Sequence, residues 1–456
     1  MRRVGSIAAV VTLALTACSG RMTAGDRIAP AAPDRAAAVK SGSWLTYHAN
    51  PRRTGVDTGS PGLHSVHRAW TSPALDGAIY AEPLVRGTRV FVATENDSVY
   101  ALSAGTGHVI WRTHVGTPMN GSQLPCGNID PSGITGTPAI AAKTGTLYAV
   151  AFVQPGRHQF VAINLSTGHL KWRRSADPRT GFDPMVHQQR GALVIANGRV
   201  YAPYGGLEGD CGNYHGTVVG RRLTGAGFIH YKVPSQREAG IWATQGTAVD
   251  ATGHLLVATG NSSSSGSFDY GNATIRLSAT LHKVGFFAPS NWKSLNAGDV
   301  DLGSIAPTPL PNGLVFQGGK EGIGYLLRQK HPGGIGGQAF SKQVCSSMWG
   351  GTAFSGGRVF VSCGNGVYAL HIRFSPPRFS IAWSGGGFNA GPPIVAGGAV
   401  WSVDIDAGVL HAFSPRTGNQ RLSRSVGSVE HFTTPTAAGG HLYVAASNRV
   451  VAFAGI

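Results

Sequence analysis

Short runs of alternating apolar and polar residues, separated by turn residues, fill the chain from residue 44 onward. The pattern is clearest between Tyr80 and Trp111. It predicts three short strands, a tight Thr106-Gly107 turn and a fourth strand, at residues 81–85, 89–94, 98–102 and 109–111. Alternation bounded by Gly, Asn and Asp is typical of half-buried antiparallel strands. This segment therefore predicts one small four-stranded antiparallel sheet.

The same unit recurs along the chain. In three copies, an apolar strand leads through a Thr-Gly pair to Trp or Leu with one constant spacing, ending at Trp111, Trp172 and Leu422. A second series of positions precedes a Val- or Leu-rich strand and marks eight copies: Pro83, Pro138, Gly191, Thr247, Pro307, Thr352, Pro393 and Pro435. Sheets of this size cover their apolar faces by stacking radially. We expect an all-β fold, an eight-bladed β-propeller of four-stranded antiparallel blades.

The two ends of the repeat array complement each other. The last copy reaches Ile456 after its third strand, whereas His67-Arg68-Ala69-Trp70 is a Trp-ending strand that belongs to no blade of its own. We expect this N-terminal strand to complete the final blade and close the ring.

These residues resemble the repeat of the PQQ-repeat (quinoprotein-like) propellers, in which an Ala-Leu strand, a Thr-Gly turn and a Trp-ending strand mark each blade. Trp44-Leu45-Thr46-Tyr47 and Arg53-Thr54-Gly55 also look like the opening of that family. The resemblance covers residues 44–456 and implies a single eight-bladed propeller domain. The same blade serves dehydrogenases and non-catalytic scaffolds, so the fold leaves the function open.

The N-terminus has the pattern of an export signal. Two arginines precede a short apolar run, and residues 1–17 therefore read as a signal peptide that is too short to span a bilayer. Leu15-Thr16-Ala17-Cys18 resembles a bacterial lipobox, although an ordinary signal with an incidental cysteine is the alternative. We expect Cys18 to carry the lipid, residues 18–43 to form a disordered tether, and the protein to be extracytoplasmic and anchored to the bacterial cell membrane.

Four further cysteines suit an oxidising compartment. Of their three possible pairings we favour Cys126 with Cys211, which lie in two long insertions, and Cys345 with Cys363, which bracket one blade. No Cys-x-x-Cys motif is present, which argues against a zinc site or a redox relay.

Charge suggests what surrounds the protein. Lys and Arg exceed Asp and Glu by 38 − 21 = 17, and loss of Arg2 and Arg3 with the signal leaves +15. Outside the cytoplasm this favours anionic lipid headgroups, an anionic envelope polymer or an envelope protein as partner, and no nucleic acid. Because the basic residues are scattered, a merely soluble cationic surface is the alternative. Motifs of serine hydrolases, zinc proteases and P-loop enzymes are absent.

The copies differ in length, and the long insertions fall in one half of the ring, at residues 120–133, 205–216, 261–271 and 287–303. Binding sites on repeat arrays are built from such insertions. We expect a functional site there.

The resemblance assigns roles to several residues of that half. Trp242 matches the indole on which quinoprotein dehydrogenases lay the flat cofactor PQQ, and Lys320 matches a cation against the quinone oxygens. Asn261 matches a calcium ligand, and Asp299 and Asp301 match the catalytic stretch, one of them acting as base. Where that family has its second calcium carboxylate, this chain has Cys211 or, with a shift of one residue, Asp210. The adjacent cysteine pair that covers the other face of the quinone in that family is missing here.

Each of these residues also has a structural interpretation. Trp242 would fill the core of its blade, Asn261 would cap a turn, Asp299 and Asp301 would be loop carboxylates, and Lys320 would be a solvated charge. The polar run His187-Gln188-Gln189-Arg190 precedes an innermost strand, so it should lie near the central channel, either binding a ligand or facing water.

Two functions therefore remain. We favour a membrane-anchored binding or scaffold lipoprotein of the cell envelope, with no certain cofactor. The alternative is a dehydrogenase that uses PQQ and calcium to oxidise an alcohol or sugar.

Overall fold

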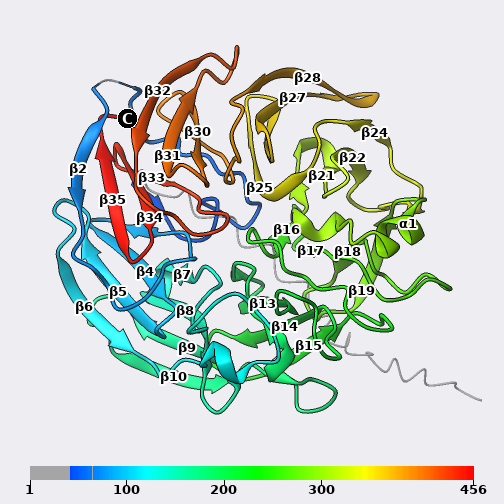
Figure 1. Cartoon of the computed structure of the whole chain (residues 1–456), viewed down its shortest axis with the longest axis horizontal. Coiled ribbons are helices and arrows are strands. Elements are labelled where there is room, and N and C mark those ends of the chain that lie inside the picture. Colours follow the sequence, from blue (N-terminus) through cyan, green and yellow to red (C-terminus); the bar gives the residue numbers. More distant parts are fainter. Residues whose placement is uncertain (1–41, 64) are drawn as a thin grey trace, which may run out of the picture.

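The computed structural model describes residues 42–63 and 65–456. Eight antiparallel sheets, each built around four main strands, surround a central axis (Figure 1). The predicted eight-bladed β-propeller is confirmed. The signal peptide, Cys18 and nearly all of the tether lie outside the described residues.

The strands of the first four blades are as follows. Blade 1 holds β1 (Ser43–Trp44), β3 (Leu84–Arg86), β4 (Arg89–Thr94), β5 (Ser98–Ser103) and β6 (Val109–His114); blade 2 holds β7 (Ala139–Ala141), β8 (Thr146–Val153), β9 (Arg157–Asn164) and β10 (Leu170–Ser175). Blade 3 holds β11 (His187–Gln188), β12 (Val194–Ala196), β13 (Arg199–Gly206), β14 (Thr217–Arg222) and β15 (Ile229–Lys232); blade 4 holds β16 (Ala248–Val249), β17 (Leu255–Ala258), β18 (Thr274–Leu277), β19 (Lys283–Ala288) and β23 (Gly334–Ile335).

The remaining four blades follow the same order. Blade 5 holds β20 (Thr308–Pro309), β21 (Leu314–Gln317), β22 (Ile323–Arg328) and β24 (Phe340–Gln343); blade 6 holds β25 (Met348–Ser355), β26 (Arg358–Cys363), β27 (Gly366–Phe374) and β28 (Pro377–Gly385). Blade 7 holds β29 (Ile394–Ala396), β30 (Ala399–Asp404), β31 (Val409–Phe413) and β32 (Gln420–Ser425); blade 8 holds β33 (Thr436–Ala438), β34 (His441–Ala446), β35 (Arg449–Ala454) and β2 (His67–Thr71).

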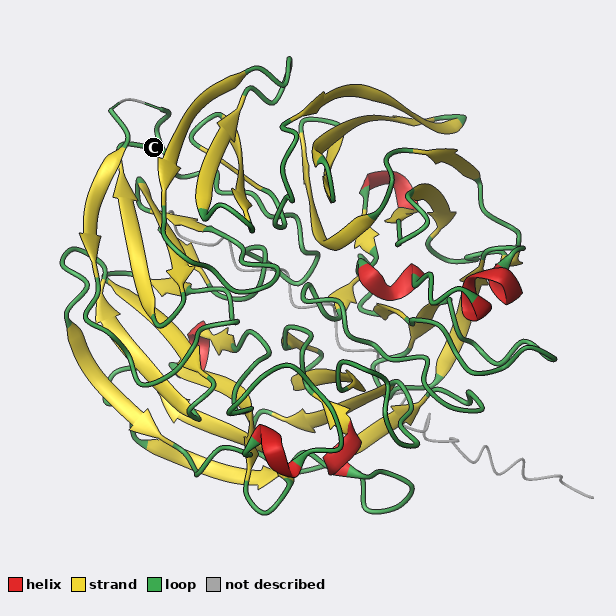
Figure 2. Ribbon diagram, viewed as in Figure 1, coloured by secondary structure: helices red, strands yellow, loops and turns green. Residues whose placement is uncertain are grey.

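Helices in the described part of the chain are few and short, and they lie in the connections between strands (Figure 2). They are the α-helix α1 (Trp292–Ala297) and the 3-10 turns η1 (Gly121–Gln123), η2 (Ala142–Thr144), η3 (Pro184–Val186), η4 (Leu302–Ser304) and η5 (Pro311–Gly313). No helix among these residues has the length and apolar character needed to cross a bilayer.

The repeated Trp and Thr-Gly residues join neighbouring blades. The indole of Trp111 on β6 donates to the Leu165 carbonyl at 3.1 Å, and its ring lies against Gly168 of the Thr-Gly turn of blade 2. Gly168 has φ +75°, and a Cβ there would lie 2.8 Å from the indole. Trp70 repeats this contact with Gly107, so glycine is required both for the left-handed turn and for the room it leaves.

The N-terminal strand closes the ring as predicted. Strand β2 pairs antiparallel with β35, with Trp70 opposite Ala452, and the two lie side by side in Figure 1. Trp70 is 8% exposed and donates from its indole to the Ala104 carbonyl of blade 1 at 2.9 Å. The strand therefore completes blade 8 and also binds it to blade 1.

Residues 44–57 fill the central channel, a feature that the sequence did not predict. Their hydrogen bonds reach the innermost parts of blades 1, 2, 3, 4, 6, 7 and 8, through Glu82, Ile140, Leu193, Val249, Thr352, Val395 and Thr434. Arg53 is fully buried there and donates to the carbonyls of Leu193 at 3.0 Å and Thr247 at 3.1 Å. We call this segment the channel plug.

The connections define two faces of the ring. The upper face carries the connections from each outermost strand to the next blade and those between second and third strands; the lower face carries the others. Position along a strand therefore decides which face a residue reaches, because successive strands of a blade run in opposite directions.

Candidate functional site

A cavity of about 490 Å³ opens on the upper face. Its walls come from connections of several blades: Tyr80, Asn128, Ile129, Gln188, Arg190, Gly206, Leu207, Glu208, Gly209, Asp210, Tyr214, Trp242, Asp299, Asp301, Lys320, Trp349, His431 and Phe432. Three of the four long insertions, at residues 120–133, 205–216 and 287–303, contribute lining residues, so the expected site in this half of the ring coincides with the cavity. The cavity combines an aromatic wall with carboxylates and two cations, a composition typical of sites for small polar ligands.

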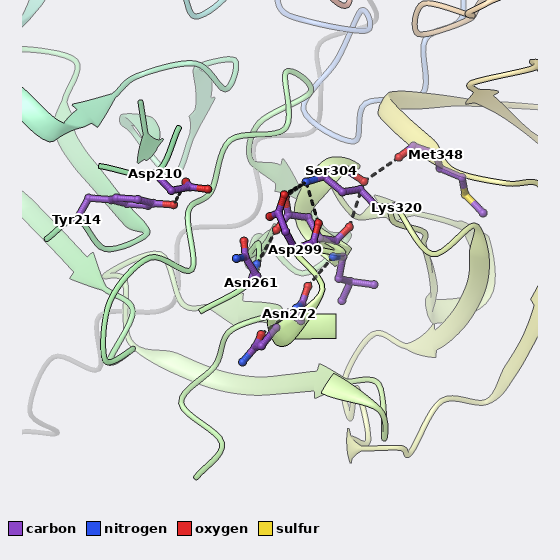
Figure 3. A network of polar contacts seen from close by, with 11 residues as sticks. Asp210, Tyr214, Asn261, Asn272, Asp299, Ser304, Lys320 and Met348 are labelled. Atoms are coloured by element: carbon purple, nitrogen blue, oxygen red, sulfur yellow. Dashed lines mark hydrogen bonds and ion pairs between the residues drawn. The ribbon is translucent and has the colours of Figure 1, made fainter. Parts of the chain in front are cut away.

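Asp301 and Lys320 form the polar centre of the cavity. Lys320 Nζ lies 2.8 Å from Asp301 Oδ2 and 3.3 Å from Asp299 Oδ2. The other oxygen of Asp301 accepts a hydrogen bond of 2.6 Å from the backbone N–H of Asn261. The Asp301 side chain is nearly buried, whereas that of Asp299 is 63% exposed. The structure thus brings Asn261, Asp299, Asp301 and Lys320 together (Figure 3).

Tight backbone packing holds this centre in place. A Cβ on Gly260 would lie 2.5 Å from Asp301 Oδ1, and one on Gly303 would lie 2.5 Å from the carbonyl carbon of Thr259. The N–H of Leu302, next to Asp301, donates to Asn272 Oδ1 at 2.7 Å, and Ser304 Oγ donates to the Met348 carbonyl at 2.7 Å (Figure 3). The Asp301 carboxylate is therefore positioned by its surroundings before any ligand arrives.

Burial sets the protonation of this pair. Burial raises the pKa of Asp301, and the attraction of Lys320 and the Asn261 N–H oppose that rise in part. Burial lowers the pKa of Lys320, but the carboxylates of Asp301 and Asp299 outweigh it, so this pKa is raised overall. Asp301 is thus a carboxylate with enhanced proton affinity beside a permanent cation, as a general base requires.

Trp242 belongs to an aromatic wall. Its ring lies 6.2 Å from that of Trp349 and 6.3 Å from that of Phe432, and all three line the cavity. Lys320 Nζ lies over Trp242 and Trp349 at 5.8 and 5.4 Å. Trp242 is only partly buried, so it faces the cavity and does not fill a blade core.

Sequence reasoning missed Trp349 and Phe432, although the repeat carries a signal for them. Each lies three residues before a register position, Thr352 and Pro435, and Tyr80 has the same relation to Pro83. In the structure this position points into the cavity from several blades. An aromatic residue there was therefore a usable indication of a binding wall.

The polar run before blade 3 divides between cavity and interior. Gln188 and Arg190 line the cavity. Arg190 lies between the rings of Tyr80 and Phe432, 5.2 and 5.3 Å from their centres. His187 is buried, bonded to the Asp183 carbonyl at 2.6 Å, and Gln189 is buried against the Gly191 carbonyl.

Asp210 lines the same cavity and lies apart from Asp299 and Lys320 in Figure 3. Tyr214 donates from its hydroxyl to Asp210 Oδ1 at 2.5 Å, which fixes the carboxylate. Burial and the nearby Asp210 raise the pKa of Tyr214, so the phenol stays protonated as donor. Glu208, which the sequence did not single out, adds another carboxylate to the cavity.

The donor set around Asn261 suits a hard cation. With its amide nitrogen toward the carboxylates, Asn261 donates to Asp301 Oδ1 at 2.7 Å and Asp299 Oδ1 at 3.3 Å. An amide that turns over presents its oxygen instead, and two carboxylates with an amide oxygen are ligands that calcium accepts. Among the described residues no three His, Cys, Asp or Glu side chains form a metal group, so the ion would need Asn261.

Both predicted disulfides are present. Cys126 bonds to Cys211 and Cys345 to Cys363. The first joins two connections that line the cavity. The Cys345–Cys363 bridge connects the segment that follows β24 with the last residue of β26. Neither cysteine lines the cavity, and the cavity residue nearest to them along the chain is Trp349.

The described residues form an eight-bladed β-propeller with a polar pocket on its upper face. A family model described as outer membrane protein assembly factor BamB matches residues 64–290, just under half of the chain. The chain is also similar to a polyvinylalcohol dehydrogenase of Sphingopyxis sp. (strain 113P3), with 23% identity over 508 residues, covering 91% of this chain and 74% of that protein.

Solved structures show the same fold. The quinohemoprotein alcohol dehydrogenase ADHIIG of Pseudomonas putida HK5 matches with a TM-score of 0.70 and 15% identity, over 91% of this chain and 80% of that one. The quinohemoprotein alcohol dehydrogenase of Comamonas testosteroni gives 0.70 and 16%, over 92% and 81%. BamB from Moraxella catarrhalis gives 0.58 and 13%, over 86% and 98%.

Proposed function

We propose that this protein is a PQQ- and calcium-dependent dehydrogenase that oxidises an alcohol or a sugar. The observation that carries the proposal is the meeting of Trp242, Asp301 and Lys320 in one cavity, since these are residues to which the quinoprotein resemblance assigns roles. The similarity to alcohol and polyvinylalcohol dehydrogenases supports it.

The residues present fit the cofactor. Trp242, Trp349 and Phe432 offer a flat apolar wall for a planar ring system. Arg190 and Lys320 are cations that would pair with the carboxylates and quinone oxygens of PQQ. Asn261 and Asp210 would hold calcium, with Glu208 and Asp299 as further carboxylates of the cavity. When bound, the quinone supplies a two-electron acceptor for a hydride.

Within this arrangement the protein moves a proton. With hydride acceptance supplied by the quinone, the role of this chain would be to take the O–H proton of the alcohol onto a carboxylate. Asp301 fits this role better than Asp299, because it is buried and its pKa is raised, whereas Asp299 is mostly exposed. Lys320 keeps the charge of the centre balanced while the proton is absent.

The proposal is tested by binding and turnover of the purified chain. Micromolar PQQ with calcium should quench tryptophan fluorescence and support dye reduction by primary alcohols or sugars. Trp242→Phe should weaken PQQ binding, while Trp111→Phe, which packs between blades 1 and 2, should leave it unchanged. Absence of PQQ binding by the unaltered protein would contradict the proposal.

The scaffold function favoured by the sequence has its own support in the BamB family match. It predicts retention of an envelope protein on the propeller with no response to PQQ. The dehydrogenase is supported better, because a scaffold has no need of a buried carboxylate paired with a lysine beneath an aromatic wall. We further propose an extracytoplasmic location, which the two disulfides favour.

A further inference from the structure

Two loops from different blades meet at one wall of the cavity. The first, residues 120–133, connects blade 1 to blade 2; the second, residues 207–213, connects β13 to β14 in blade 3. Cys126 and Cys211 join them. The residues beside these cysteines, Asn128 and Ile129 on one loop and Glu208, Gly209 and Asp210 on the other, line the cavity. We call the pair the tied-loop wall.

Each loop is organised internally but is bonded weakly to the other. In the first loop, Gly121 N–H donates to Asp130 Oδ1 at 2.8 Å; in the second, Asp210 N–H donates to the Leu207 carbonyl at 3.1 Å. Among the described residues no hydrogen bond joins one loop to the other. The covalent bridge is therefore the principal link that keeps the two halves of this wall together.

The chain lacks the adjacent cysteine pair that covers the quinone in the resembling dehydrogenases, and a cofactor with one face on Trp242 needs cover elsewhere. From the position of the tied-loop wall we infer that the Cys126–Cys211 bridge provides this cover, because it holds the two loops closed against the bound cofactor and so sets its affinity. The inference rests on the proposed function. Its physical basis is preorganisation, since a wall already closed loses little entropy on binding.

The second disulfide provides a matched control. Cys345 and Cys363 are buried at 7% and 1% exposure, whereas Cys126 and Cys211 are both partly exposed. The control bridge also lies on a different blade from the tied-loop wall. Removing either bridge deletes two sulfur atoms and one cross-link, but only the first removal frees two loops that line the cavity. Cys345 of the second bridge lies four residues before Trp349, whose indole keeps its own hydrogen bond to Ser347 Oγ at 2.8 Å.

The experiment measures PQQ affinity in the presence of calcium for the wild type, Cys126→Ser/Cys211→Ser and Cys345→Ser/Cys363→Ser. We expect the first double variant to raise Kd tenfold or more and to speed PQQ release, and the second to stay within twofold of the wild type. Without cofactor, amide hydrogen exchange at residues 120–133 and 207–213 should accelerate in the first double variant alone.

Should the first double variant not fold, the wild type treated briefly with a dithiol replaces it. The exposed bridge opens first, its two sulfurs becoming thiols as the dithiol is oxidised, and thiol alkylation with peptide mass mapping identifies the opened bridge. Unchanged PQQ affinity with only Cys126–Cys211 opened overturns the inference and leaves the proposed function standing. A wild type that binds no PQQ overturns the proposed function, and this inference with it.

Discussion

Asp301 and Lys320 show how one buried pair decides the chemistry of the cavity. Burial raises the pKa of Asp301, and the ammonium of Lys320 at 2.8 Å opposes that rise. The sequence placed both residues in the site by resemblance to quinoproteins. Their contact and the difference in burial between Asp301 and Asp299 depend on the packing of Gly260 and Gly303, which no local pattern encodes.

Lys320→Met should move the pH dependence of alcohol oxidation. Loss of the ammonium removes the influence that lowers the pKa of Asp301, so this pKa rises further and a higher pH is needed to generate the base. We expect the acid limb of the kcat/KM profile to shift upward by about one pH unit. Lys293→Met, an exposed lysine on α1, is the control. An unshifted profile would argue against Asp301 as base.

Asp97→Asn should change how stability depends on pH. Burial and the neighbouring Glu95 raise the pKa of Asp97 to about 9 from 3.8. The fold therefore holds the neutral acid, and its contribution to stability is full below about pH 4 and is lost as the pH rises toward 9. Between pH 5 and 8 the unfolding free energy of the wild type should fall relative to the variant by up to about 1.4 kcal/mol per pH unit.

Urea unfolding at several pH values measures this difference. Asp406→Asn, at an exposed carboxyl, should run parallel to the wild type. A constant gap between the wild type and Asp97→Asn across this range would show that Asp97 is ionised in the fold.

At the scale of elements, the channel plug is one segment that forms hydrogen bonds with seven of the eight blades. Arg53 is its most buried charge, and its guanidinium donates to backbone carbonyls of blades 3 and 4 and to Tyr47. Because the cation satisfies oxygens that water cannot reach, its removal leaves several of them unpaired.

Arg53→Met should lower the unfolding free energy by about 2–4 kcal/mol, since those carbonyls lose their donors. The adjacent Arg52 is exposed, and Arg52→Met should stay within about 0.5 kcal/mol of the wild type. Chemical denaturation of both variants makes the comparison. Equal stability of the two variants would mean that the plug contributes little.

Local patterns predicted most of the blade and less of the cavity. The Thr-Gly turn has a local cause, a left-handed glycine. The Trp of β6 and of β10 packs on the glycine of the following blade, and because this contact recurs from blade to blade, the repeat displays both residues in the sequence. Trp349 and Phe432 meet Trp242 only because the ring brings blades 4, 6 and 8 to one wall. The channel plug likewise depends on contacts with residues far away in the sequence, and the alternation of apolar and polar residues does not predict such contacts.

At the scale of the whole molecule, the two faces of the ring have different roles. All residues of the cavity lie in upper-face connections or at the strand ends next to them. Ser43, by contrast, pairs with Arg86 at the lower end of β3, and Gly42 lies beside Gly439 in the lower-face turn of blade 8. The chain thus enters the ring from the face opposite the cavity.

Attachment through residue 42 should leave ligand binding intact. We expect protein that begins at residue 42 and is coupled to a surface through a cysteine added directly before it to bind PQQ with a Kd within twofold of that in solution. Coupling through a cysteine introduced at exposed Glu208, beside the cavity, should reduce the bound fraction strongly. Surface plasmon resonance compares the two orientations, and equal binding in both would contradict the assignment of the cavity to the upper face.

The lower-face position of Gly42 also affects how accessible the cavity is when the protein is attached to a surface through this end of the ring. A protein held at residue 42 would turn the mouth of the pocket toward the surrounding fluid and the opposite face of the ring toward the support. Bulky ligands would then meet an unobstructed opening.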